Sequence, residues 1–171
     1  MFVRFLLPFI GAVLFLIEPV FALFSPVELF GNMIYLVPRF LFMYLLFLAV
    51  YYNWKYAVIS GIVFGLLYDV FYIDIIGLYA VLYPLLCLSI SWIIKWIQQS
   101  LLVVTLLTIL FVAVLEFIMY EFFFIISFTS MPIDVFLYTR LIPTLLANLL
   151  FLVMLGWAFK YLIKTRFLQR V

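Results

Sequence analysis

The stretch SGIVFGLLYD, residues 60–69, places two glycines four residues apart and then ends on a carboxylate inside an otherwise apolar run. On a helix, Gly61, Gly65 and Asp69 lie along one side, because residues four apart share a face. Glycines at this spacing let the backbone of another helix approach closely. Ordinary helix packing explains the glycine pair taken alone, but it does not explain the aspartate. We predict that the close contact brings Asp69 next to polar groups on neighbouring helices.

The composition of the chain indicates that lipid is its main solvent. Of its 171 residues, 72% are hydrophobic and only 9% are charged. Soluble domains are about half apolar and about a quarter charged, and a domain of this size has too little interior to bury the excess. The N-terminal apolar run lacks an Ala-x-Ala cleavage site and contains Glu18-Pro19, so we expect a retained helix rather than a signal peptide. The sequence therefore predicts an integral membrane protein.

Six apolar runs approach the length of a spanning helix, which needs about 20 apolar residues. A closed β-barrel is the other structure that can span a bilayer, but the runs lack its alternation of apolar and polar residues. We predict an all-α bundle that forms a single polytopic membrane domain over residues 1–171. The predicted helices cover about residues 5–24, 36–52, 55–72, 76–97, 101–126 and 138–161.

The basic residues predict the orientation of this bundle. With six spans, most of the nine Lys and Arg residues fall on one side of the membrane, and that side is expected to be cytoplasmic. The loops on the opposite side carry Glu28, Asp74 and Asp134 and no lysine. We therefore predict that both termini are cytoplasmic. The basic residues on that side are Arg4, Lys55, Lys95, Lys160, Lys164, Arg166 and Arg170.

Several further charges lie at membrane depth, where an ionisable side chain usually faces a partner or a cavity. At a rise of about 1.5 Å per residue, all of them reach the outer half of a hydrocarbon core about 30 Å thick. Arginine can bridge two carboxylates while it stays charged. We therefore predict a structural ion-pair cluster in which two arginines are shared among three acids, with the pairing left open. Its members are Glu18, Arg39, Asp69, Glu116 and Arg140.

A polar stripe on the last predicted helix accompanies this cluster, since Arg140, Thr144 and Asn148 follow one another at intervals of four. Two interpretations of the cluster stay open. A charged cavity among the helices could hold a polar solute or relay protons. Alternatively, the charges only fix how the helices pack, as buried ion pairs can do. We favour the second interpretation, because acids and arginines nearly balance.

Catalytic chemistry has little support in the residues. The chain has no histidine, and its one cysteine, Cys87, lies inside an apolar run. Tyr68-Asp69 matches half of an intramembrane aspartyl protease signature, but Asp74 does not supply the other half. No phosphate-binding loop and no metal-ligand spacing is present. We expect no enzymatic activity, no metal or other cofactor and no nucleic-acid partner.

Three short motifs form a specific combination along the chain: Pro-Arg at 38–39, Gly-x3-Gly-Leu-x2-Asp at 61–69 and Arg-x2-Pro at 140–143. Together they resemble the motifs of the MreD family of bacterial rod-shape-determining membrane proteins, most closely its Gram-positive members. The resemblance spans nearly the whole chain. Its motifs are FLLPF at 5–9, LVPRFLF at 36–42, GIVFGLLYD at 61–69, IGLYAVLYPL at 76–85, VLEF at 114–117 and RLIPTLLANL at 140–149.

This resemblance implies a non-enzymatic, multi-pass subunit of the cell-elongation machinery in the bacterial cytoplasmic membrane. Such a protein would bind the single-span scaffold MreC and help link MreB filaments to the glycosyltransferase and transpeptidase that polymerise lateral peptidoglycan. The resemblance also implies a fold similar to the substrate-binding subunits of energy-coupling-factor transporters. A subunit that binds a vitamin-type solute is therefore the alternative function. No catalytic residues carry over, so Arg39, Asp69 and Arg140 transfer as motif positions only.

Overall fold

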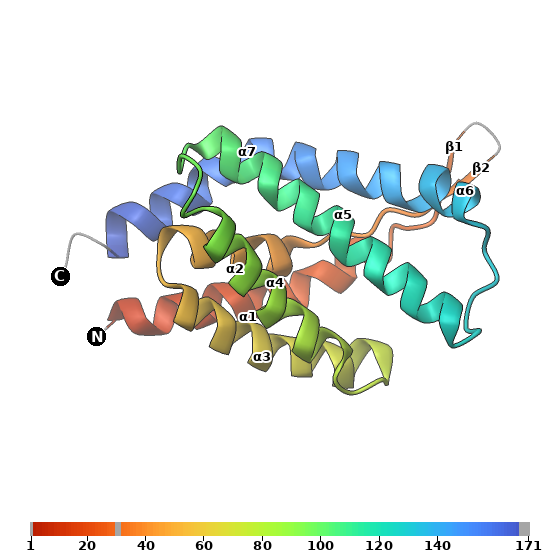
Figure 1. The fold of residues 1–171 in the computed structure, drawn as a ribbon, viewed down its shortest axis with the longest axis horizontal. Helices are drawn as coiled ribbons and strands as arrows, with labels where there is room; N and C mark the ends of the chain where they lie inside the picture. The colour runs from red at the N-terminus through yellow and green to blue at the C-terminus, as the bar shows by residue number, and fades with distance from the viewer. Residues whose placement is uncertain (1, 30–31, 168–171) are drawn as a thin grey trace.

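The computed structural model describes residues 2–29 and 32–167, and its helices form one elongated bundle (Figure 1). Six helical segments follow one another along the chain, each overlapping one predicted range, and the all-α prediction is confirmed. The turns η1 and η2 are π-helical. Turn η1 extends α3, and turn η2 joins α6 to α7. The elements are α1 (Phe2–Ala22), β1 (Val27–Leu29), β2 (Asn32–Ile34), α2 (Phe40–Tyr51), α3 (Trp54–Tyr68), η1 (Asp69–Ile73), α4 (Leu78–Ile93), α5 (Leu101–Ile125), α6 (Ile133–Phe136), η2 (Leu137–Leu141) and α7 (Ile142–Phe167).

The helical segments fall into two length classes. The ones long and apolar enough to cross a membrane are Trp54–Ile73, Leu101–Ile125 and Ile133–Ile163. The shorter apolar ones are Leu6–Ala22, Phe40–Tyr51 and Leu78–Ile93. At about 1.5 Å per residue, α2 extends only about 18 Å, which is well short of a bilayer core. Non-helical chain must therefore complete the crossing at α2.

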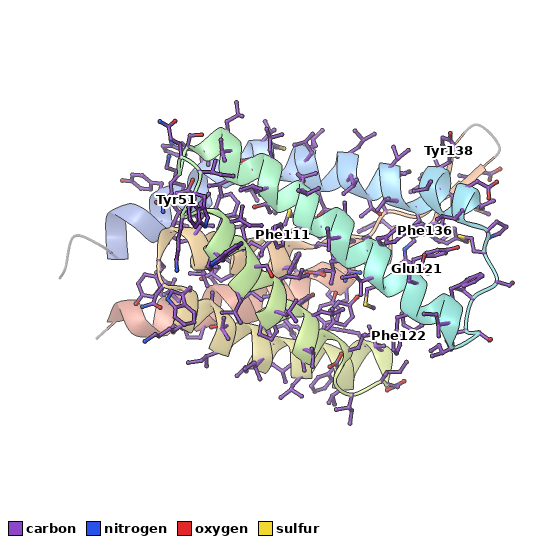
Figure 2. The ribbon with its side chains drawn as sticks, in the orientation of Figure 1. Tyr51, Phe111, Glu121, Phe122, Phe136 and Tyr138 are labelled. Carbon is purple, nitrogen blue, oxygen red and sulfur yellow. The ribbon has the colours of Figure 1, made fainter. Side chains whose placement is uncertain are left out.

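Helix α2 is the centre of the bundle. All of its residues are buried, and it contacts α1, α3, α4, α5 and α7. A helix that is apolar all round is stable where every face meets protein or lipid, and here every face meets protein. The surrounding helices point side chains outwards around the bundle (Figure 2). On α5, for example, Leu102, Leu106 and Leu110 are each more than half exposed, which suits a surface that faces lipid.

The start of α2 differs from the prediction, which began that helix at residue 36. Val37 precedes Pro38, and the residue before a proline is disfavoured in the α-helical conformation. Residues 35–39 are therefore non-helical, and α2 begins at Phe40. Inside a membrane, non-helical backbone is tolerated only where protein groups or a water-filled cavity satisfy its N–H and C=O groups.

A short antiparallel hairpin was missing from the prediction. Its strands, β1 and β2, pair Val27 with Ile34 and Glu28 with Met33 at the end of the bundle near α6 (Figure 1). Strands of three residues are too short to show the alternation by which a strand is predicted. The hairpin leaves the class of the fold unchanged.

The glycines of the opening stretch lie where α3 packs against α4. A Cβ atom at Gly65 would lie 2.5 Å from the carbonyl oxygen of Tyr79 and 2.7 Å from the backbone of Ala80. At Gly61 it would lie 3.1 Å from the backbone nitrogen of Pro84. The absence of side chains at these positions therefore sets the distance between the two helices.

The first turn of α1 and the last turn of α7 lie at the same end of the bundle (Figure 1). An even number of crossings produces this arrangement. That this end is the cytoplasmic one stays a prediction.

Candidate functional site

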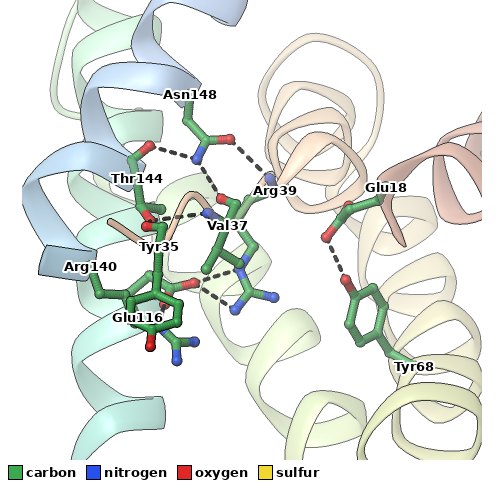
Figure 3. Close-up of polar contacts among 9 residues, drawn as sticks. All are labelled: Glu18, Tyr35, Val37, Arg39, Tyr68, Glu116, Arg140, Thr144 and Asn148. Carbon is green, nitrogen blue, oxygen red and sulfur yellow. Dashed lines mark hydrogen bonds and ion pairs between the residues drawn. The ribbon is translucent and has the colours of Figure 1, made fainter. Parts of the chain in front are cut away.

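Arg39 and Glu116 form a buried ion pair in the interior of the bundle (Figure 3). Arg39 directly precedes α2 and is 2% exposed, while Glu116, on α5, is fully buried. Nε and Nη2 of Arg39 lie 2.6 Å and 2.5 Å from Oε1 of Glu116. The guanidinium carbon of Arg39 also lies 5.4 Å from the ring centroid of Tyr79, within the range of a cation–π contact. The pair fixes the start of α2 against α5.

Arg140 binds the other oxygen of the same carboxylate. Its Nε lies 3.3 Å from Oε2 of Glu116, and its side chain is 39% exposed. The π-helical turn η2 carries this arginine and joins α6 to α7. The structure thus brings together Arg39, Glu116 and Arg140, with one carboxylate between two guanidinium groups.

Glu18 and Asp69 lie outside this ion-pair group, in contrast to the expectation that the arginines are shared among three acids. Glu18, on α1, accepts a hydrogen bond of 2.6 Å from the hydroxyl of Tyr68 and one of 3.0 Å from the backbone N–H of Leu41. Leu41 belongs to the first turn of α2, where the N–H groups have no partner within the helix. Glu18 therefore caps α2 from a neighbouring helix.

Asp69 has the same relation to α4. Its carboxylate accepts hydrogen bonds from the backbone N–H groups of Gly77, Tyr79 and Ala80 at 2.9, 2.8 and 3.0 Å. The partial positive charge of a helix N-terminus stabilises an anion at this position. Asp69 is fully buried, and these N–H groups are its partners in place of an arginine. Asp69 thus lies against polar backbone groups of the neighbouring helix α4.

Replacing Asp69 with alanine is expected to destabilise the protein by about 2 kcal/mol or more, because buried N–H groups of α4 lose their charged acceptor. Asp69→Asn keeps one amide oxygen and should retain part of this stability. Thermal unfolding of the purified variants in one detergent measures the difference. As a control, the exposed Asp74 changed to asparagine, which tolerates the left-handed conformation at this position, should leave the midpoint unchanged. Equal midpoints for all variants would contradict the capping role.

The polar stripe of α7 satisfies the non-helical segment before α2 (Figure 3). The hydroxyl oxygen of Thr144 accepts from the backbone N–H of Val37 at 3.1 Å and donates to the carbonyl of Tyr35 at 3.3 Å. The side-chain amide of Asn148 accepts from the N–H of Arg39 and donates to the carbonyl of Val37, both at 2.9 Å. Thr144 and Asn148 thus provide hydrogen-bond partners for backbone groups in the non-helical segment around Pro38.

Sequence reasoning did not identify a group of tyrosines beside the charges. The ring of Tyr68 lies 4.8 Å from that of Tyr79, and Tyr79 lies 5.1 Å from Tyr83, measured between centroids. Tyr83 is fully buried, and its hydroxyl has no hydrogen-bond partner within the described part of the chain. The signal was available, because Tyr79 and Tyr83 are four residues apart and so share a face of α4.

The fold and this network define a multi-pass α-helical membrane protein whose buried charges hold helix ends and a non-helical segment in place. Residues 3–166 match the family described as rod shape-determining protein MreD. The rod shape-determining protein MreD of Bacillus subtilis (strain 168) is 34% identical over 146 residues, which is 85% of each chain. The chain belongs to the MreD family, and the resemblance found in its motifs is confirmed.

Family membership makes this chain a rod shape-determining membrane protein. No solved structure matches it. The likeness to the substrate-binding subunits of energy-coupling-factor transporters therefore stays a prediction.

Proposed function

We propose that this chain is a non-enzymatic scaffold of the cell-elongation machinery that binds MreC in the plane of the membrane. Through MreC it helps couple cytoplasmic MreB filaments to the glycosyltransferase and transpeptidase that build lateral peptidoglycan. The observation that carries the proposal is membership of the MreD family over nearly the whole chain. MreC, MreB and the polymerases enter as what that resemblance implies.

The chemistry of the interior supports a structural role. Glu116 is held by two arginines, Asp69 by three backbone N–H groups and Glu18 by a tyrosine and the start of α2. The contacts of Glu116 and Glu18 join segments that are up to 77 residues apart in sequence, which suits a scaffold that must present a fixed surface.

A topology experiment tests the orientation on which this proposal depends. We expect both termini to be cytoplasmic, because the basic residues of the sequence favour that side. A fluorescent protein that folds only in the cytoplasm should fluoresce when fused to either end, and should stay dark when inserted after Ser127, between α5 and α6. Fluorescence from the insertion and not from the terminal fusions would reverse the topology.

Affinity purification from membranes in mild detergent tests the partners. The tagged chain is expected to recover MreC and, through it, the peptidoglycan polymerases, and to restore rod shape to cells depleted of their own MreD. A tagged multi-pass protein of another family at equal abundance is the control. Recovery of an ATPase and a coupling subunit in place of MreC would contradict the scaffold and favour the transporter subunit.

A further inference from the structure

A pocket of about 300 Å³ lies at the end of the bundle opposite the termini. It is enclosed by the last turns of α5, the segment 126–132, α6 and η2. Met119, Phe123 and Phe136 form its apolar wall, and Thr129 and Arg140 contribute polar atoms. Phe136 of α6 stacks on Tyr120 of α5 at a centroid distance of 4.1 Å, and Figure 2 labels Phe136 at this end of the bundle. The volume is at the lower end of the range for small-molecule sites.

Arg140 is the charged side chain in the lining of this pocket, and it shares its carboxylate partner with a second arginine. Two guanidinium groups share the single carboxylate of Glu116, and Arg39 makes the two shorter contacts. Arg140 uses only Nε, and its terminal nitrogens have no hydrogen-bond partner among residues 6–28 and 33–163, whose side chains the structure describes. The nearby acids Glu121 and Asp134 form no ion pair with it within those ranges, and Asp134 is exposed. Two donor groups of a half-exposed guanidinium are therefore free for an anion.

Thr129 adds a second donor to the same pocket. Its hydroxyl oxygen accepts from the backbone N–H of Met131 at 3.3 Å, so the hydroxyl hydrogen is left to donate elsewhere. The hydroxyl of Tyr120, by contrast, already donates to the carbonyl of Met131 at 2.8 Å. Arg140 and Thr129 together form a pair of donors beside an apolar wall.

The position of the pocket selects the kind of anion. Segment 126–132 connects Leu101–Ile125 and Ile133–Ile163, two helices long enough to span, so it lies at a membrane surface. Phosphate groups of lipids occupy that level, and arginine recognises phosphate through several donors at once. A soluble anion would leave the apolar wall facing water, whereas a lipid covers both parts of the pocket.

We propose that this pocket binds the phosphate-bearing end of a membrane lipid. The phosphate contacts Arg140 and Thr129, and the first carbons of a hydrocarbon chain contact Met119, Phe123 and Phe136. The site goes beyond the scaffold function and does not depend on it.

Native mass spectrometry of the full chain in detergent tests the site with three probes: dioleoylphosphatidylglycerol, dioleoylglycerol and inorganic phosphate. We expect the phospholipid to bind at least about tenfold more tightly than dioleoylglycerol, because only the phospholipid meets the charged donors. Inorganic phosphate should not displace it. Equal binding of the two lipids would overturn the proposal. If inorganic phosphate displaced the phospholipid, the pocket would be a site for a soluble anion, and the proposal of a lipid would be overturned.

Variants localise the binding. Arg140→Gln should weaken phospholipid binding by about tenfold or more, and Thr129→Val by about threefold. Arg140→Lys keeps the charge, so its affinity for the phospholipid should lie between that of Arg140→Gln and that of the unchanged protein. Lys55→Gln, an exposed charge at the opposite end of the bundle, is the matched control and should change nothing. If Arg140→Gln does not fold, Thr129→Val decides, and unchanged binding by the folded variant overturns the proposal.

Discussion

Replacing Glu116 with glutamine is expected to remove most of the folded protein from the membrane. Arg39 is 2% exposed, and Glu116 is its carboxylate partner in the part of the chain that the structure describes. Breaking a buried ion pair by removing one partner costs about 3–5 kcal/mol, because the other charge stays buried and uncompensated. Native proteins are stable by only about 5–15 kcal/mol. The measurement is the yield of monodisperse protein on size-exclusion chromatography, together with its thermal midpoint.

Two comparisons separate the loss of the ion pair from the loss of any carboxylate on α5. Glu121→Gln, on the same helix, removes a half-buried carboxylate that has no ion pair within the described ranges, and it should leave the yield unchanged. The double variant Arg39→Met with Glu116→Gln should recover part of the loss, since no unpaired charge remains buried. Wild-type yield and midpoint for Glu116→Gln alone would show that the pair does not hold α2 against α5.

Elementary physics applied to the sequence predicted that Arg39, Glu116 and Arg140 belong to one buried polar cluster, but not which acid binds which arginine. Charges in lipid require partners, and counting residues from the helix ends placed these three in the outer half of the hydrocarbon core. Apolar runs of sufficient length predicted the helical segments, because lipid is the solvent of this chain. Both inferences depend on the solvent and on helix geometry, and neither requires knowledge of how the chain turns.

The partners of Glu18 and Asp69 could not be obtained in the same way. Each carboxylate binds the N-terminus of a helix, and the depth of a carboxylate does not show that it caps the start of a neighbouring helix. The predicted helices also began earlier, at residues 36 and 76, than α2 and α4 do. Pro38 and Gly77 were the available signals. A proline disfavours helix at the preceding residue, and Gly77, with φ of 108°, takes a conformation that other residues rarely adopt.

The role of Thr144 and Asn148 was inaccessible for a related reason. Their spacing showed a shared face, but not that the face meets a non-helical segment more than 100 residues earlier in the chain. Local sequence pattern reports which residues lie together on one helix. It does not report which backbone groups elsewhere have lost their helical partners.

Gly65→Ala is expected to be nearly as damaging as the loss of Glu116, although it adds only one methyl group. The new Cβ atom would lie 2.5 Å from the carbonyl oxygen of Tyr79 and 2.7 Å from the backbone of Ala80. Helix backbone cannot move aside as a flexible side chain can, so α4 must shift away from α3. Overpacking typically costs about 1–3 kcal/mol, and here the shift also lengthens the hydrogen bonds from Tyr79 and Ala80 to Asp69. We expect a total loss above about 3 kcal/mol.

Alanine substitutions at three glycines test whether the short distance from the new Cβ atom to its neighbours causes the loss of stability. The corresponding Cβ would lie 3.1 Å from the Pro84 backbone nitrogen at Gly61, and 3.7 Å from a side-chain carbon of Phe47 at Gly156. Gly61→Ala should therefore lower the thermal midpoint less than Gly65→Ala. Gly156→Ala should leave it unchanged or raise it, since alanine favours helix over glycine by up to about 1 kcal/mol. If all three variants shifted the midpoint equally, helix propensity would explain the effect, and the close approach of α4 to α3 would not require glycine.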